Sequence, residues 1–224
     1  MNLHEYQAKR LLADHGIPVP EGLVAESAAE ARAAAERLGG RVAVKAQVLV
    51  GGRGKAGGVV LAESADEAAQ AAGRLLGQPM RGWTVGQVLV ERRAEIEEEL
   101  YLGLALDRSA RCMRLIASSA GGVGIEETAR VQPASIHTTA LDPLVGLRPY
   151  HANGAAAAIG LRPELWRAWA GVAQALYAAA QATDATLAEI NPLVVTPAGT
   201  LLALDAKVTL DDNALFRHPD LAAL

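Results

Sequence analysis

Cysteine and long apolar runs are scarce in this chain. Its 224 residues contain one cysteine, Cys112, which excludes a disulfide framework. Because Cys112 lies in an alternating apolar segment, it is typical of a buried free thiol. No run approaches the roughly 20 apolar residues that span a bilayer, and the N-terminus has no apolar signal core. We therefore expect a cytoplasmic protein with no membrane partner.

An excess of one charge is also lacking. The 21 Lys and Arg residues are scattered among 25 Asp and Glu residues, which gives a net charge of −4. Because no basic stripe is present, we do not expect nucleic acid as a partner. Hydrophobic residues make up 51% of the chain, enough for the core of one large or two small domains.

Glycine, by contrast, is concentrated in one place. Residues 42–50 alternate, with apolar side chains on one face and Lys45 and Gln47 on the other. Five glycines follow within residues 51–58, and the apolar run 59–61 comes directly after them, which predicts a glycine-rich β-hairpin. Glycine backbones leave N–H groups uncovered for phosphate oxygens. With Lys45 beside them, they suggest a site for a nucleotide polyphosphate.

Two common phosphate-binding folds do not fit this loop. Gly52, Gly54 and Gly57 match the spacing of the dinucleotide fingerprint, but that fingerprint requires a helix next, and here a strand follows. A Walker A loop needs Ser or Thr after its lysine, whereas Ala56 follows Lys55. The remaining interpretations are a hairpin flap over phosphates and a surface hairpin without a ligand.

The flanking segments predict two lobes. Capping patterns at Ser27 and Ser64 open helices that end near Leu38 and Gly77. With the glycine hairpin between them and a strand at 85–91, these helices form one lobe. The other contains a helix at 3–15, a hairpin of strands 100–106 and 111–118, and an amphipathic helix that begins at Pro163.

A second hairpin carries acidic residues. Strands 187–192 and 201–207 flank a turn at 197–199, and a register symmetric about Ala198 places Asn191 opposite Asp205 and Glu189 opposite Lys207. Opposed side chains are only about 5 Å apart at Cβ. An amide oxygen and a carboxylate suit Mg²⁺, which takes its other ligands from water and phosphates. The alternative is a solvated face with an ordinary Glu189–Lys207 ion pair.

Several motifs in order resemble one family, the β subunit of ADP-forming succinyl-CoA synthetase. The resemblance covers essentially the whole chain and is carried by residues 2–9, 51–58, 99–103, 189–193 and 213–217. It implies an α/β ATP-grasp fold with a glycine-rich hairpin flap. One lobe would comprise residues 21–94, and the other residues 1–20 and 95–224 with the metal-binding hairpin.

The resemblance also implies an activity and a partner. The family is an acid–thiol ligase of the tricarboxylic acid cycle that joins succinate to CoA at the expense of ATP. Phosphoryl passes between ADP or ATP, with Mg²⁺, and a phosphohistidine on an α subunit that also carries the CoA site, in an αβ or α2β2 complex. None of the five histidines in this chain has a setting that suggests the phosphorylated one.

Site residues follow from the resemblance by motif position. Lys45 would contact nucleotide phosphates, and Gly52, Arg53 and Gly54 would form the flap. Glu91 and Ala94 would lie at the adenosine, and Glu99 near the ribose. The resemblance assigns the metal to Asn191 and Asp205, as the hairpin register does. It also places Glu189 where a carboxylate could orient the incoming phosphohistidine.

The chain departs from the family pattern at two places. Ala120 and Gly124 stand where the family usually has acidic residues. The family's C-terminal CoA-ligase domain has no counterpart before Leu224. We therefore expect this chain to bind ADP or ATP with Mg²⁺ but not to make an acyl-CoA by itself. Three alternatives stay open: the ATP-grasp part of a malate–CoA or other carboxylate–CoA ligase, a non-catalytic nucleotide-binding module, and an amine ligase without a histidine carrier.

Overall fold

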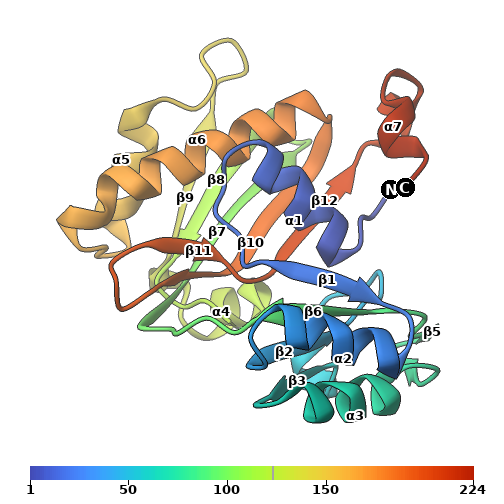
Figure 1. Ribbon diagram of the computed structural model, residues 1–224. Coiled ribbons are helices and arrows are strands. Elements are labelled where there is room, and N and C mark those ends of the chain that lie inside the picture. Colours follow the sequence, from blue (N-terminus) through green and yellow to red (C-terminus); the bar gives the residue numbers. More distant parts are fainter. Residues whose placement is uncertain (123) are drawn as a thin grey trace. The chain divides into compact units, whose positions relative to one another are not determined.

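The structure, a computed structural model, describes residues 1–122 and 124–224. The backbone forms two compact units (Figure 1). Unit 1 consists of Met1–Leu3, Gln7–Val19 and Glu95–Leu224, and unit 2 consists of His4–Tyr6 and Pro20–Ala94. No helix among the described residues is long and apolar enough to cross a membrane.

Unit 2 is built on a four-stranded antiparallel sheet. The strands lie in the order β1 (Gly22–Ala25), β6 (Val88–Arg92), β2 (Val42–Ala46) and β3 (Val59–Ala62). Two helices, α2 (Ala28–Arg37) and α3 (Ala65–Leu75), pack on the face that carries Val42, Val44 and Ala46. The remaining elements are a short hairpin and one 3-10 turn: β4 (Pro79–Met80), β5 (Trp83–Thr84) and η1 (Gly54–Ala56).

Both predicted helix caps of unit 2 are confirmed. The Ser27 hydroxyl accepts a hydrogen bond from the N–H of Glu30, and the Ser64 hydroxyl accepts one from the N–H of Glu67. The returning bond differs from the capping box, because the Glu30 carboxylate accepts from the N–H of Glu26, one residue before the cap. Each serine hydroxyl still satisfies a backbone donor that the first helical turn leaves open.

Unit 1 contains a six-stranded antiparallel sheet. Five strands lie in the order β11 (Leu201–Ala203), β10 (Ala185–Val195), β7 (Glu98–Asp107), β8 (Cys112–Ser118) and β9 (Ile136–Leu141), and β12 (Ala206–Leu210) also pairs with β10. The helical segments are α1 (Glu5–Asp14), α4 (Ile125–Val131), η2 (Pro133–Ser135), α5 (Pro149–Ala158), η3 (Pro163–Leu165), α6 (Trp166–Ala182), η4 (Asp212–Arg217) and α7 (Pro219–Ala222). Helix α1 begins in unit 2 and continues in unit 1.

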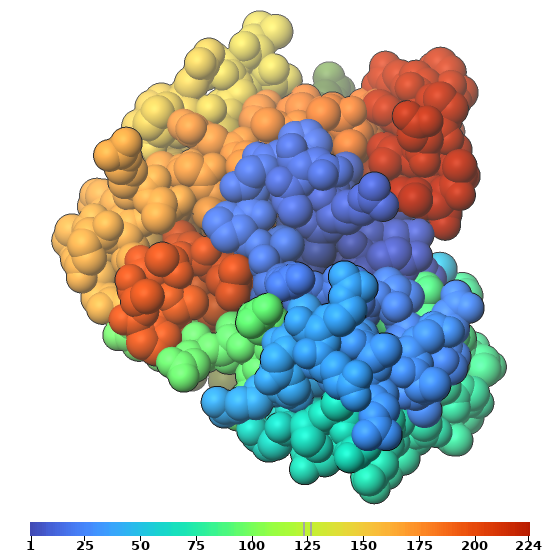
Figure 2. All heavy atoms as spheres, viewed as in Figure 1, coloured from blue at the N-terminus to red at the C-terminus, as the bar shows by residue number. Residues whose placement is uncertain are grey.

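Helix α6 provides much of the core of unit 1. Its buried stripe includes Trp169, Val172 and Leu176, at the helical spacing that the sequence predicts. The Trp169 ring is fully buried and its N–H donates to the carbonyl of Ala152 on α5, so this side chain packs in the core of unit 1. In the space-filling view α5 and α6 form the yellow and orange surface of this unit (Figure 2).

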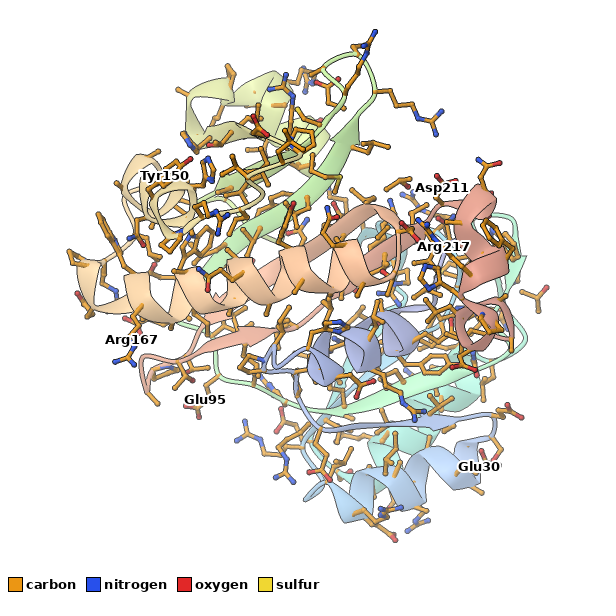
Figure 3. All side chains as sticks on the ribbon, turned by 90° about the horizontal axis from the view of Figure 1, so that it is seen from above. Glu30, Glu95, Tyr150, Arg167, Asp211 and Arg217 are labelled. Atoms are coloured by element: carbon orange, nitrogen blue, oxygen red, sulfur yellow. The ribbon has the colours of Figure 1, made fainter. Side chains whose placement is uncertain are left out.

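The C-terminal segment is fixed to unit 1 by charged groups. Arg217 forms a bidentate ion pair with Asp184, with N–O distances of 2.7 and 2.5 Å, and His218 contacts the same carboxylate at 2.6 Å. Figure 3 shows Arg217 close to Asp211, which caps η4 by accepting from the N–H of Asn213. The two ends of the chain lie side by side (Figure 1).

The predicted hairpins form with the expected partners. Strand β2 pairs with β3, and β7 with β8. The acidic hairpin keeps its symmetric register, since Glu189 lies opposite Lys207 and Leu193 opposite Ala203. Strand bounds were less accurate. The run 42–50 is regular only to Ala46, and the strand predicted over 85–91 begins at Val88, after the β4–β5 hairpin.

Candidate functional site

In unit 2, Lys45 lies in the interior of the sheet. Strand β2 runs between β6 and β3, so Lys45 has Leu89 on one side and Val59 on the other. Its ammonium group donates to Glu91 Oε1 at 2.7 Å and to Glu5 Oε1 at 3.0 Å. These three side chains are buried, with 7% or less of each residue exposed. The predicted phosphate lysine therefore belongs to an internal ion network.

Glu5, the first residue of α1, joins this network to the glycine loop. Its second carboxylate oxygen lies 2.7 Å from Arg53 Nη1 and accepts a hydrogen bond of 3.1 Å from the Gln47 side chain. Arg53 Nη1 also donates to the carbonyl of Ala46 at 3.0 Å. Each of the two cations, Lys45 and Arg53, is thus paired with a carboxylate. Removing one partner from such a buried group leaves a charge without compensation, which is strongly destabilising.

The network affects a neighbouring histidine. Partial burial lowers the pKa of His4, and the positive charge of Arg53 lowers it further. His4 stacks on Tyr6 with ring centroids 6.0 Å apart. The lowered pKa favours a neutral imidazole at this position beside an arginine.

The glycine loop has an exposed backbone and one buried side chain. Gly52 and Gly57 have φ values of +75° and +74°, which favour glycine. Gly52 and Gly54 are exposed, whereas Arg53 between them is 6% exposed. The carbonyl of Arg53 accepts from the N–H groups of Ala56 and Gly58, at 3.0 and 2.8 Å, and so closes the loop.

Two of the three residues assigned to the nucleoside, Ala94 and Glu99, lie outside this network. Ala94, the last residue of unit 2, is half-buried. Glu99 is exposed on β7 in unit 1, opposite Val194. Glu91, the third, is held by Lys45, so its carboxylate is already charge-paired.

In unit 1, the register of β10 brings the two predicted metal ligands together. The N–H of Asn191 donates to the carbonyl of Asp205 at 3.0 Å, and both residues are half-buried. The peptide bond between Asn191 and Pro192 is cis. Asn191 Oδ1 accepts a hydrogen bond of 2.9 Å from the N–H of Gly122, which orients the amide.

The Gly121–Gly122 turn after β8 packs tightly on β7. A Cβ on Gly121 would come within 2.7 Å of the backbone N and C of Leu100. Gly122 has φ +72°, and a Cβ there would lie 3.0 Å from Glu99 Cδ. The side chains of Glu99 and Asn191 therefore both lie next to the backbone of Gly122. Val123, the next residue of this motif, lies outside the described residues.

Glu189 has a partner that the sequence did not predict. Its Oε2 accepts a hydrogen bond of 2.8 Å from the hydroxyl of Tyr101, a residue only 1% exposed. Gly103 lies opposite Glu189, and a Cβ there would be 2.6 Å from the tyrosine oxygen. Within the described part of the chain, no ion pair joins Glu189 to Lys207.

Comparison with known proteins identifies the fold family. The ATP-grasp domain family matches this chain over residues 2–195. The chain belongs to the ATP-grasp family. The α/β ATP-grasp fold predicted from the sequence is therefore confirmed.

Two curated relatives of this chain are named as β subunits of succinate–CoA ligases. The chain is 55% identical to the β subunit of ADP-forming succinate–CoA ligase from Chloroflexus aggregans over 225 residues. It is 52% identical to the β subunit of the GDP-forming ligase from Thermus thermophilus over 224 residues. Both alignments cover 100% of this chain and 59% of the relative. The chain thus spans about three-fifths of the length of these proteins.

A solved structure has the same ATP-grasp fold at low sequence identity. The ACD1 protein of Ca. Korarchaeum cryptofilum in complex with coenzyme A superposes with a TM-score of 0.75 and 20% identity. The alignment covers 94% of this chain and 93% of that chain. This likeness supports the fold alone.

The oxygen atoms that the acidic hairpin offers fit part of the coordination shell of Mg²⁺. Asn191 and Asp205 offer one amide oxygen and one carboxylate, and Mg²⁺ completes an octahedron with water and phosphate oxygens. Among the described side chains, which do not include those of Val123 and Glu126, no group of three or more His, Cys, Asp or Glu residues forms an alternative metal cluster.

Sequence reasoning missed four residues that contact predicted site residues. They are Glu5, Gln47, Tyr101 and Gly122. Glu5 lies 40 residues from Lys45 along the chain, and no local pattern pairs them. Gln47 shares the face of Lys45, which was noted without a role. The Tyr101–Glu189 contact could have been found from the β7–β10 register, because the Gly103 gap lies beside Tyr101.

Proposed function

We propose that this chain is the nucleotide-binding ATP-grasp part of a succinate–CoA ligase β subunit. The observation that carries the proposal is identity above 50% to two such subunits across the whole chain. The reaction would be succinate + CoA + ATP = succinyl-CoA + ADP + phosphate, in the cytoplasm. A partner α subunit would carry the phosphohistidine and the CoA site.

The two units would be the two ATP-grasp lobes. In unit 2, the exposed backbone of Gly52 and Gly54 would meet the phosphates, because uncovered N–H groups bind anionic oxygens. Lys45 would supply positive charge to them. Its buried pairs with Glu5 and Glu91 favour a role in which the ammonium is held at a fixed place by carboxylates. Glu91 and Ala94 would lie at the base.

Unit 1 would supply the metal ligands and the transfer carboxylate. Asn191 and Asp205 would hold Mg²⁺, which neutralises phosphate charge during phosphoryl transfer. Glu99, beside the Gly121–Gly122 turn, would contact the ribose. Glu189 would orient the imidazole of the partner's phosphohistidine by accepting its N–H, and the Tyr101 hydroxyl fixes the position of that carboxylate.

The same site could take adenine or guanine as the base of the nucleotide. One relative is named ADP-forming and the other GDP-forming, at similar identity. We favour adenine, on the motif positions of Glu91 and Ala94. Parallel titrations with ADP and GDP in Mg²⁺ separate the two, and tighter binding of GDP would reverse this assignment.

The transfer step is tested with a histidine-phosphorylated α subunit that carries a radioactive phosphate. Mixed with this chain, ADP and Mg²⁺ at high protein concentration, it should pass label to ATP. Without the α subunit, the chain should form no succinyl-CoA from ATP, succinate and CoA. If ADP binds but no label moves, the chain is a nucleotide-binding module without a catalytic role. Thioester formation by the chain alone would contradict the need for a partner.

A further inference from the structure

Among the residues of the glycine loop (51–58) that carry a side chain, Arg53 is buried, whereas Lys55 and Ala56 are exposed. Its neighbours Gly52, Gly54 and Lys55 are exposed, whereas 6% of Arg53 is exposed and its guanidinium points into unit 2. There it meets Glu5 Oε2 at 2.7 Å and the Ala46 carbonyl at 3.0 Å. An arginine whose purpose is to meet phosphate from the loop surface would keep its donors outward.

The backbone of Arg53 closes the loop at the same point. Its carbonyl accepts from the N–H groups of Ala56 and Gly58. Gly58 in turn accepts from the N–H of Ala46, next to Lys45 on β2. The side chain and backbone of one residue therefore tie the whole turn 53–58 to the end of strand β2.

Glu5 is the counterpart of this anchor. Its carboxylate contacts donors from two places in the chain, among them Lys45 and Gln47 of the strand segment and Arg53 of the loop. Exposure of the Glu5 side chain is 1%. A hydrogen bond between charged, buried groups is about twice as strong as a neutral one and fixes geometry. One carboxylate thus sets the spacing between the lysine and the loop.

We propose that Glu5 and Arg53 form an internal latch that holds the glycine loop in its phosphate-binding conformation. Both are positioning residues, and the loop meets phosphate through its backbone N–H groups and not through the Arg53 guanidinium. This inference rests on the proposed nucleotide function for its consequence, but the latch itself can be tested without a nucleotide. It also assigns a role to Glu5, whose position in the sequence suggested none.

Limited proteolysis measures the latch directly. Trypsin cuts after Lys55, which is exposed in the loop, and after Arg108, which is exposed in the β7–β8 turn of the other unit. We expect Glu5→Gln and Arg53→Met to raise the rate at Lys55 relative to Arg108 by about tenfold or more, as loss of a charged buried hydrogen bond predicts. The double variant should exceed neither single variant by more than about twofold, because each change already breaks the Glu5–Arg53 contact.

Matched controls make the same chemical changes elsewhere in unit 2. Glu67→Gln alters a glutamate in the first turn of α3, and Arg74→Met alters an exposed arginine in its last turn. Neither should change the ratio of the two cleavage rates. Arg53→Lys, which keeps the charge but loses the fork of donors, should restore part of the protection.

Nucleotide titration then tests the consequence. Glu5→Gln and Arg53→Met should weaken ADP binding by about tenfold and adenosine binding by less than about twofold, since only the phosphate loop is loosened. If wild type binds no ADP, the proposed function fails while the cleavage ratio still decides the latch. Equal acceleration at Lys55 and Arg108, or a ratio unchanged from wild type, would overturn the latch. Unchanged ADP affinity beside a raised ratio would overturn its role in binding.

Discussion

Replacing Gly121 with alanine is a sharp test of how the Asn191 hairpin is supported. Gly121 follows β8, and its N–H donates to the carbonyl of Glu99 at 3.0 Å. An added Cβ would lie within 2.7 Å of the Leu100 backbone in β7, an inner strand of the sheet. Backbone atoms of a paired inner strand cannot rotate aside as a side chain can. The turn itself must therefore move away from β7.

The expected loss of stability can be worked out from the bonds that this movement breaks. The Gly121 bond to Glu99 and the Gly122 bond to Asn191 are each worth about 1 kcal/mol net. Overpacking adds about 1–3 kcal/mol. The sum is about 3–5 kcal/mol, which corresponds to a fall in Tm on the order of 10 °C for a unit of this size.

Scanning calorimetry of Gly121→Ala measures this change, with Gly171→Ala as the control. Gly171 lies on α6, where an added Cβ would meet no atom within 4 Å, and alanine is favoured in a helix by about 0.5–1 kcal/mol. The control should melt at or slightly above the wild-type temperature. A Gly121→Ala protein with an unchanged Tm would refute the tight packing of the turn on β7.

Three further predictions concern charge. Lys45→Ala should reduce affinity for ADP far more than for adenosine, measured by calorimetry, and equal losses would separate Lys45 from the phosphates. Asp205→Asn should weaken ADP binding in Mg²⁺ by about tenfold but leave binding in EDTA nearly unchanged, because it removes the only carboxylate of the proposed metal pair. Hydrogen bonds from Arg217, and to a smaller extent from His218, hold the pKa of Asp184 below its usual 3.8. These bonds therefore stabilise the folded protein above that pH, and their contribution is lost as the pH falls below it and Asp184 is protonated. Asp184→Asn should therefore flatten the acid limb of the Tm–pH curve, and an acid limb identical to wild type would contradict the pair's contribution.

Local patterns in the sequence predicted most of the elements that place the site. The serine caps of α2 and α3, the glycine hairpin and the register that sets Glu189 opposite Lys207 were all confirmed. Each depends on residues close in sequence, through turn length or helix capping. Register is reliable there because a slip by one residue would turn every side chain of β10 to the opposite face.

Contacts between distant residues could not be predicted in the same way. Alternation placed Lys45 on the second face of β2 but gave no reason for that face to be buried. It is buried because Glu5, 40 residues earlier, supplies a carboxylate beside it. The Tyr101 hydroxyl likewise replaces Lys207 as the partner of Glu189, because the gap at Gly103 lets the ring reach across from β7.

The most direct test of the whole account is a calorimetric titration of the wild-type chain with ADP, in Mg²⁺ and again in EDTA. We predict saturable binding at one site per chain, several-fold tighter or more with Mg²⁺, because the glycine loop meets the phosphates and Asn191 with Asp205 holds the cation. Absence of binding in Mg²⁺ would contradict the central claim that this chain is the nucleotide-binding part of the ligase.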